Sequence, residues 1–199
     1  MKLYYSPGAC SLATDIVLRE AKLKADFVKV DLESKKTEKG DDFNAVNPKG
    51  YVPALQLDDG DVLTENVAVL QYLATLEPRL LPSTGMAKWH AVESLAFVST
   101  EIHKAFKPLF DRSAADDVKR KAKEQIAKRL GNAEQMLGSR EHIVGDAFTV
   151  VDAYLFVMLM WSEKQEVSIP ASLKKYASRL RERPSVKEAL AFEGLDAKG

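Results

Sequence analysis

The chain has 199 residues, which is long enough to bury one or two hydrophobic cores. Its residues are 46% apolar and 29% charged, as is usual for a globular protein. Because 29 basic residues balance 29 acidic ones, no broad basic surface is expected, and we expect no nucleic-acid partner. The start of the chain predicts a strand rather than a signal peptide, and no run of about 18 apolar residues occurs. We therefore expect a cytoplasmic protein that does not cross a membrane.

Residues 1–77 predict a small mixed sheet with helices, in the order β-α-β-(α)-β-β-α. Asp58-Asp59-Gly60 is a hairpin turn signal, and Thr64 is a candidate N-cap for the helix that follows. The expected strands are residues 2–6, 27–30, 54–57 and the return strand from 62; the expected helices are 10–21, a short one through 43–46, and one that begins after Thr64.

Residues 78–85 are rich in helix breakers and predict a linker between two domains, residues 1–77 and 86–199. Everything after the linker has helical patterning. Thr149 and Asp152 form a capping-box pattern at the start of the most apolar segment, which we expect to be the buried core helix. The expected helices are 86–110, which Pro108 kinks or ends, and 116–137, 149–163, 171–181 and 185–192.

Two features of residues 47–66 suit a small zwitterionic peptide. Pro53 permits a cis bond that would turn the N–H and C=O of Val52 toward an extended peptide. The helix start at residues 64–66 offers free N–H groups for a carboxylate, and Glu65 suits an α-amino group. A proline at a sheet edge followed by an ordinary capped helix fits the same spacing, and that simpler alternative is the more common one.

Cys10, the only cysteine, is predicted at a helix start directly after a turn. The helix dipole and unpaired N–H groups at such a place lower a cysteine pKa from about 8.5 to roughly 3.5–7.5, which makes a thiolate nucleophile. The alternative is a small buried cysteine that only packs. A single cysteine excludes an internal disulfide.

His103 lies on one predicted helical stripe with Phe106 and Phe110, and Lys104 is beside it. This histidine either lines an active site or is a half-buried structural residue with a satisfied hydrogen bond. His90 and His142 are expected at the surface. The three histidines and one cysteine form no metal-ligand pattern, so we expect no metal.

Five motifs resemble those of the bacterial beta-class glutathione transferases, in matching order and spacing. They are Tyr-Tyr-Ser-Pro-Gly-Ala-Cys-Ser (4–11), Asn-Pro-Lys-Gly-Tyr-Val-Pro (47–53), Leu-Thr-Glu (63–65), Glu-Ile-His-Lys (101–104) and Gly-Asp-Ala-Phe-Thr-Val-Val-Asp-Ala-Tyr (145–154). The resemblance implies a thioredoxin-like α/β N-terminal domain, an all-α C-terminal domain and a homodimer. It also implies glutathione as co-substrate and a small apolar electrophile as the second substrate.

Carried over by position, the resemblance implies catalytic roles for Cys10 and His103. Glutathione would be bound by Cys10, Lys35, Val52, Pro53, Glu65, Asn66, Thr100, Glu101, His103 and Lys104, and Phe106, Phe110 and Trp161 would line the apolar pocket. Conjugation, dehalogenation and thiol–disulfide exchange all remain open as the reaction. The alternative function is a non-catalytic protein that binds glutathione or apolar ligands. Two departures are Asn66, where the family usually has serine or glycine, and Ala96, where relatives can have an asparagine that reaches glutathione across the dimer.

Overall fold

A computed structural model describes residues 1–196 and shows two compact units. The first unit is Met1–Pro78 together with residues 182–196, and the second is Arg79–Arg181. A short 3₁₀ turn, η2 (Pro78–Leu80), spans the point where the chain first passes from one unit to the other. Within residues 1–196, no helix has both the length and the apolar character needed to span a bilayer.

The first unit is built on a five-stranded mixed sheet in the order β3-β2-β1-β4-β5. Its strands are β1 (Lys2–Tyr5), β2 (Asp26–Asp31), β3 (Lys36–Thr37), β4 (Ala54–Gln56) and β5 (Val62–Thr64). The pair β1 and β2 is parallel, while β2–β3, β1–β4 and β4–β5 are antiparallel. The parallel pair requires a crossover helix, and residues 11–20 supply it. The predicted mixed sheet is confirmed, although no strand was predicted at the position of β3.

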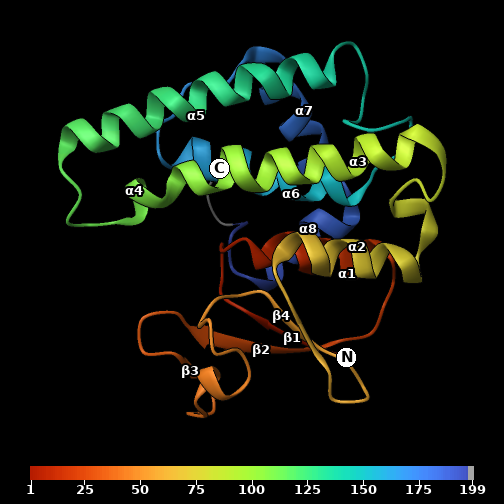
Figure 1. Ribbon diagram of the computed structural model, residues 1–199, viewed down its shortest axis with the longest axis vertical. Helices are drawn as coiled ribbons and strands as arrows, with labels where there is room; N and C mark the ends of the chain where they lie inside the picture. Colours follow the sequence, from red (N-terminus) through yellow and green to blue (C-terminus); the bar gives the residue numbers. More distant parts are fainter. Residues whose placement is uncertain (197–199) are drawn as a thin grey trace. The chain divides into compact units, whose positions relative to one another are not determined.

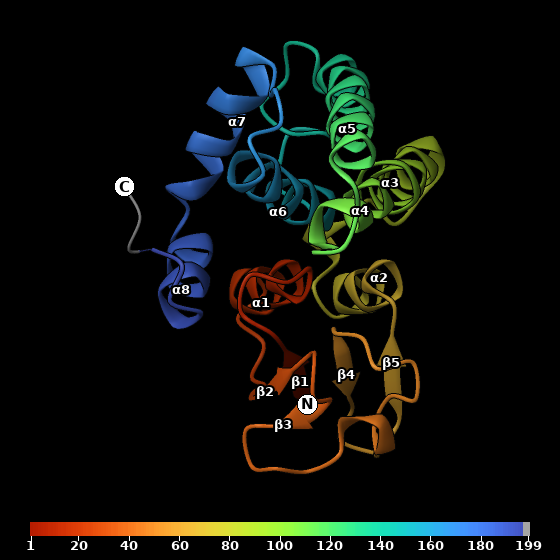
Figure 2. The ribbon, with the colours of Figure 1, turned by 90° about the vertical axis from the view of Figure 1, so that its left-hand side faces the viewer.

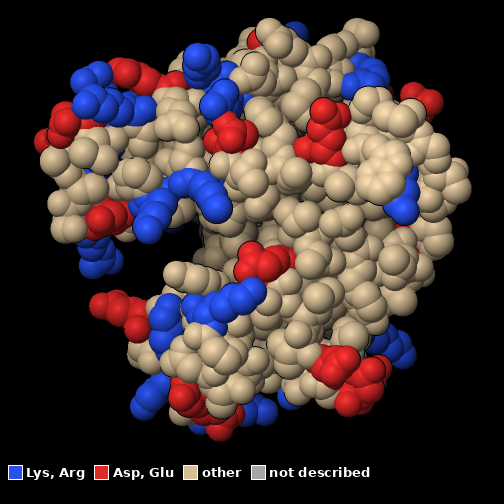
Figure 3. All heavy atoms as spheres, viewed as in Figure 1, with Lys and Arg blue, Asp and Glu red and all other residues tan. Residues whose placement is uncertain are grey.

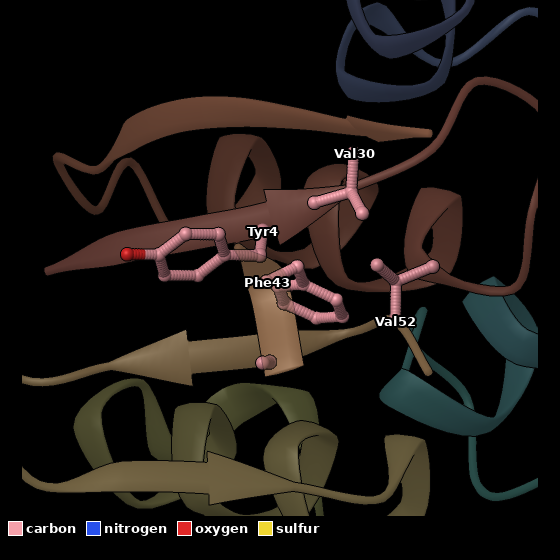
Figure 4. Close-up of a cluster of buried hydrophobic side chains, with 5 residues drawn as sticks. Tyr4, Val30, Phe43 and Val52 are labelled. Carbon is pink, nitrogen blue, oxygen red and sulfur yellow. The ribbon is translucent and has the colours of Figure 1, made fainter. Parts of the chain in front are cut away.

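Two helices, α1 (Ser11–Glu20) and α2 (Asn66–Leu76), lie side by side on one face of this sheet (Figures 1 and 2). On the opposite face, the 3₁₀ turn η1 (Phe43–Ala45) places the fully buried Phe43 ring 5.6 Å from the ring of Tyr4. Figure 4 shows Phe43 among the side chains of Tyr4, Val30 and Val52. This packing anchors the segment that leads to Val52.

The helix α8 (Pro184–Phe192) packs on α1 within the first unit (Figure 2). Arg183 and the hydroxyl of Ser185 donate to the carboxylate of Glu20, at 2.7 and 2.5 Å. This ion pair joins residues that are 163 positions apart in the chain, a distance over which sequence periodicity carries no information. The domain boundaries expected from the sequence, 1–77 and 86–199, remain a prediction.

The second unit is helical, and α6 (Val150–Lys164) lies among the other long helices (Figure 2). Twelve residues of α6 are buried, including the large side chains of Tyr154 and Phe156. A helix that is apolar on all sides belongs in a core, as predicted. The other long helices of the unit are α3 (Gly85–Phe97), α5 (Asp116–Leu137) and α7 (Ala171–Arg181).

The helix expected over residues 86–110 is not continuous. After α3 the chain forms a π-helical turn, η3 (Val98–Ile102), then a 3₁₀ turn, η4 (His103–Phe106), and the short α4 (Lys107–Phe110). The hydrogen-bonding pattern therefore changes ten residues before Pro108, which was expected to cause the break. Turns of this kind redirect side chains, and they often occur at functional sites.

The surface of α5 carries charges of both signs, and Figure 3 shows Lys and Arg beside Asp and Glu over its N-terminal half. Arg120 pairs with Glu124 at 2.6 Å, and Lys121 lies 3.7 Å from Asp117. These i,i+4 pairs lie on the solvent-exposed face of an amphipathic helix and contribute only a few tenths of a kcal/mol each. The boundaries of α5 and α7 agree with the sequence prediction.

Candidate functional site

Cys10 occupies the N-cap position of α1, directly after the turn that follows β1. The N–H of Ala9 bonds to the carbonyl of Ser6, and the hydroxyl of Ser11 accepts the N–H of Ser6. These two local hydrogen bonds stabilise the turn. The Cys10 thiol donates to the carbonyl oxygen of Val52 across 3.3 Å. Two residues that the sequence singled out separately are thus brought into contact.

The pKa of Cys10 is shifted upward, whereas its position at a helix start predicted a downward shift. Burial raises the pKa of the thiol to about 12, and the carboxylates of Glu65 and Glu193 raise it further. The backbone N–H groups of Cys10 and Ser11 lower it, as expected for a helix N-terminus, but by less than burial raises it. The residue as a whole is partly exposed. The expectation of a lowered pKa is wrong for this structure, because desolvation of the thiolate outweighs the helix dipole.

Glu193, which follows α8, was not identified from the sequence. It is only 7% exposed, and its Oε2 accepts the N–H of Gly8 at 2.7 Å, in the turn before Cys10. Its Oε1 is buried and has no hydrogen-bond partner within the described part of the chain. Burial raises the pKa of this carboxyl to about 8, and the nearby Asp15 carboxylate raises it further. No local pattern around a glutamate at a helix end could have revealed this contact.

The Val52–Pro53 bond is cis, as the sequence analysis allowed. The turn before it is held by Asn47, which is 2% exposed and whose side-chain amide donates to the carbonyl of Tyr51 at 2.7 Å. The Nζ of Lys35 donates to the carbonyl of Gly50 at 2.9 Å. Lys35 is only partly exposed, and this hydrogen bond stabilises the turn before Val52.

Glu65, not Thr64, is the N-cap of α2, because Thr64 is the last residue of β5. Glu65 has a φ of 68° and makes no side-chain cap hydrogen bond. Its Oε1 pairs with the Nζ of Lys49 at 2.8 Å, and that Nζ also donates to the hydroxyl of Thr64 at 3.1 Å. No role was predicted for Lys49 from the sequence.

Asn66, the first residue of α2, is 7% exposed, and its Oδ1 accepts the hydroxyl of Thr14 from α1 at 3.0 Å. Its Nδ2 is buried with no hydrogen-bond partner among residues 1–196. A buried amide donor without a partner is costly unless a ligand or water satisfies it. Asn66 therefore has spare donor capacity at the helix start where a carboxylate was expected to bind.

His103 lies in the second unit, where its Nδ1 is 2.6 Å from the hydroxyl of Tyr154. Its ring also meets the ring of Trp161 edge-on, with centroids 5.0 Å apart. Tyr154 is buried and the imidazole is only half-exposed. These contacts fix the orientation of the ring, and the partner of Nδ1 could not be inferred from spacing along one helix.

The three predicted pocket residues form one aromatic cluster. Trp161 meets Phe110 at 4.8 Å and Phe106 at 5.4 Å between ring centroids, both edge-on, and the two phenylalanine rings stack at 6.0 Å. Phe106 is fully buried, whereas Phe110 is 50% exposed. Phe106 therefore supports the cluster from inside, and Phe110 presents the apolar surface.

The remaining predicted residues, Thr100, Glu101 and Lys104, lie on the η3 and η4 turns. The hydroxyl of Thr100 donates to the carbonyl of Ala96, and Glu101 pairs with Arg129 at 2.7 Å. Lys104 is exposed. Glu101 is thus already engaged by a neighbouring helix.

The described residues contain no group of three or more His, Cys, Asp or Glu side chains that could hold a metal ion. The expectation that His142 lies at the surface is wrong, because it is only 8% exposed. Its Nδ1 lies 3.7 Å from Oδ1 of Asp152, within the network at the start of α6.

Two family models match this chain: the N-terminal domain of glutathione S-transferases over residues 8–76 and the C-terminal domain over residues 97–184. Glutathione S-transferase GstA of Escherichia coli O157:H7 is 43% identical over 200 residues, which cover 98% of this chain and all of that protein. The chain belongs to the glutathione S-transferase family. The thioredoxin-like domain followed by a helical domain is therefore confirmed as its fold.

Solved glutathione S-transferase structures agree with this assignment. The sphingomonad enzyme complexed with glutathione is 44% identical with a TM-score of 0.91, and the beta-class enzyme of Sphingomonas chungbukensis is 46% identical with the same score. Each alignment covers 98% of this chain and 100% of the other. The resemblance to bacterial beta-class glutathione S-transferases that the five motifs indicated is confirmed.

Proposed function

We propose that this protein, a glutathione transferase, joins the thiol of glutathione to small apolar electrophiles. The observation that carries the proposal is the 3.3 Å contact between the Cys10 thiol and the carbonyl of Val52. It puts a sulfur beside the backbone group that would pair with an extended peptide, in a chain that belongs to this enzyme family.

In the proposed complex, the peptide backbone of glutathione pairs with Val52 and lies against Pro53. The α-ammonium binds Glu65, and the neighbouring carboxylate binds the N–H groups at the start of α2, where the unpartnered Nδ2 of Asn66 supports this placement. Lys35 contributes by bracing the turn through Gly50. Thr100, Glu101, His103 and Lys104 are proposed as further glutathione-binding residues from the helical unit.

The pKa of about 12 for Cys10 favours conjugation over disulfide exchange as the main reaction. At neutral pH Cys10 is a thiol with one proton, which it donates to the carbonyl of Val52 in the unliganded protein. We propose that this hydrogen bond moves to the sulfur of bound glutathione, which would stabilise that sulfur as the thiolate. The glutathione sulfur then forms a bond to the carbon of a chloronitroaromatic, and chloride leaves with its electron pair. The thiol proton of glutathione passes to solvent. We propose His103, oriented by Tyr154, as the second catalytic residue.

The apolar electrophile is proposed to contact Phe110 and Trp161, with Phe106 supporting them from inside the unit. Aromatic side chains provide large apolar surfaces for such ligands without fixing their identity. We further propose a detoxifying homodimer in the cytoplasm, where glutathione keeps thiols reduced. The exposed Met86 and Trp89 of α3, 64% and 59% accessible, support a subunit contact.

The test is a steady-state assay of the full-length chain with glutathione and a chloronitroaromatic, beside the same assay with free cysteine as the thiol. We expect saturable turnover with glutathione and none above background with cysteine, which lacks the γ-glutamyl and glycyl groups. Saturable binding of glutathione by calorimetry without turnover would instead support the alternative, a non-catalytic binding protein. Sedimentation velocity of the same sample tests the dimer.

A further inference from the structure

Glu65, the residue proposed to receive the ammonium of glutathione, already contacts an ammonium group of its own chain. The Nζ of Lys49 lies 2.8 Å from Oε1 of Glu65 and 3.1 Å from the hydroxyl of Thr64. A lysine ammonium and an α-ammonium have the same charge and the same three donors. Lys49 therefore makes the contact that the ligand is proposed to make.

The backbone of Lys49 is held in place by the turn that carries it. Its N–H donates to Oδ1 of the buried Asn47, and the N–H of Gly50 bonds to the carbonyl of Asn47 at 2.8 Å. The side-chain amide of Asn47 also holds the carbonyl of Tyr51, next to Val52. The turn that positions Val52 for a peptide thus also directs Lys49 toward Glu65.

We infer that Lys49 is a specificity-determining residue that competes with the α-ammonium of glutathione for the carboxylate of Glu65. The inference rests on the proposed function, because it assigns the regulation of the same site. When the ligand binds, the lysine gives up or shares its contact with the carboxylate. Lys49 thereby lowers the affinity for ligands that carry the α-ammonium. Its contact with Glu65 has no such effect on the affinity for ligands that lack the α-ammonium.

The size of the competition follows from the exposure of the two side chains. Lys49 is 53% and Glu65 69% accessible, so solvent screens the pair strongly. Exposed ion pairs of this kind correspond to factors of about two to five in an equilibrium constant. Removal of Lys49 also removes a positive charge that attracts the carboxylates of any glutathione-like ligand. The affinity for one ligand is therefore ambiguous, and the ratio of the affinities for two ligands, one with and one without the α-ammonium, is needed.

The experiment measures by calorimetry the affinities of wild type and Lys49→Met for S-methylglutathione and for its analogue without the α-amino group. The S-methyl group prevents disulfide formation with Cys10. The matched control is Lys24→Met, which also removes one exposed lysine. Lys24 precedes β2, and β1 and β2 are parallel, so Lys24 lies at the end of these two strands opposite to the Cys10 turn.

We expect the preference for S-methylglutathione over the amino-free analogue to rise about two- to fivefold in Lys49→Met and to stay constant in Lys24→Met. An unchanged or smaller preference in Lys49→Met, with wild type binding both ligands, overturns the role of Lys49 and leaves the proposed function standing. No binding of S-methylglutathione by folded wild type overturns the proposed function and this inference together.

Discussion

The starts of α1 and α6 are both helix N-termini, and the chain uses them in opposite ways. At α6, Thr149 and Asp152 form a capping box, and Asp152 also accepts the N–H of Ile143 and the hydroxyl of Tyr176, at 2.9 and 2.6 Å. At α1, Cys10 stands in the cap position and makes no side-chain cap hydrogen bond. The start of α6 is thus filled by its own side chains and belongs to the core, whereas the start of α1 has no side-chain cap and is proposed to face a ligand.

The largest expected effect is at the filled helix start. Asp152→Ala removes the acceptor of four hydrogen bonds from buried donors. We expect a loss of about 4 kcal/mol in the free energy of unfolding, because buried donors are left unpaired. Urea unfolding measures the loss, with Asp152→Asn as a milder variant that keeps one acceptor oxygen. If either variant, shown to be folded, binds S-methylglutathione much more weakly than wild type, the start of α6 does not serve the core alone.

The next effect concerns the buried carboxyl that holds the turn before α1. The folded-state pKa of Glu193 is about 8, above the ordinary value of 4.5, so ionisation costs stability in the folded protein. The penalty is absent below the unfolded pKa, grows as pH rises from about 4.5 and is complete above about 8. Between pH 5 and pH 9, wild type should therefore lose about 4 kcal/mol more stability than Glu193→Gln.

The measurement is the free energy of unfolding of both proteins at several pH values. Asp15 and Arg19 of α1 lie near Glu193 and are unchanged in the variant, so the difference reports the ionisation of Glu193 in the presence of these two charges. Parallel stability curves for the two proteins would show that Glu193 ionises normally and that burial does not control it.

Cys10 at the open helix start should react slowly in the unliganded protein. A pKa of about 12 leaves little thiolate at pH 7, and the higher nucleophilicity of a basic thiolate compensates only in part. We expect iodoacetamide to modify native Cys10 roughly a hundredfold more slowly than the same residue in urea-unfolded chain. Fast modification of native protein at pH 6.5 would contradict the raised pKa. It would support instead the lowered pKa that the position of Cys10 at a helix start predicts.

The open start of α2 should govern the affinity for glutathione. Glu65→Ala removes the proposed ammonium partner, and we expect affinity to fall about tenfold. Lys35→Ala should cost less, because Lys35 acts through the turn by its bond to Gly50. Calorimetric titration ranks the two variants, and equal affinities for wild type and Glu65→Ala would refute the proposed binding mode.

The smallest effect is Thr149→Ala at the filled start. The hydroxyl donates to Oδ2 of Asp152 at 2.8 Å, and the backbone N–H of Thr149 donates to the same oxygen in the variant as well. A loss of about 1 kcal/mol in stability is expected, with glutathione affinity unchanged in the folded protein. An affinity loss in folded Thr149→Ala would place this residue among the functional ones.

Elements whose cause is local could be predicted from the amino-acid sequence alone. The limits of α5 and α7, the hairpin of β4 and β5 and the capping box of α6 follow from periodicity, turn residues and caps within a few positions. The motifs also identified the family and led to the position of Cys10 at a helix start. These features need no information about distant parts of the chain.

Only the tertiary structure decided how the groups at the candidate site behave. Burial reversed the pKa expected for Cys10, and desolvation depends on neighbours that no local pattern identifies. Glu193 reaches Gly8 across 185 positions, and Lys49 reaches Glu65 across 16, through folds of the chain that place them together. Side-chain contacts between distant segments set charge and orientation, and the spacing of residues along one element does not encode them.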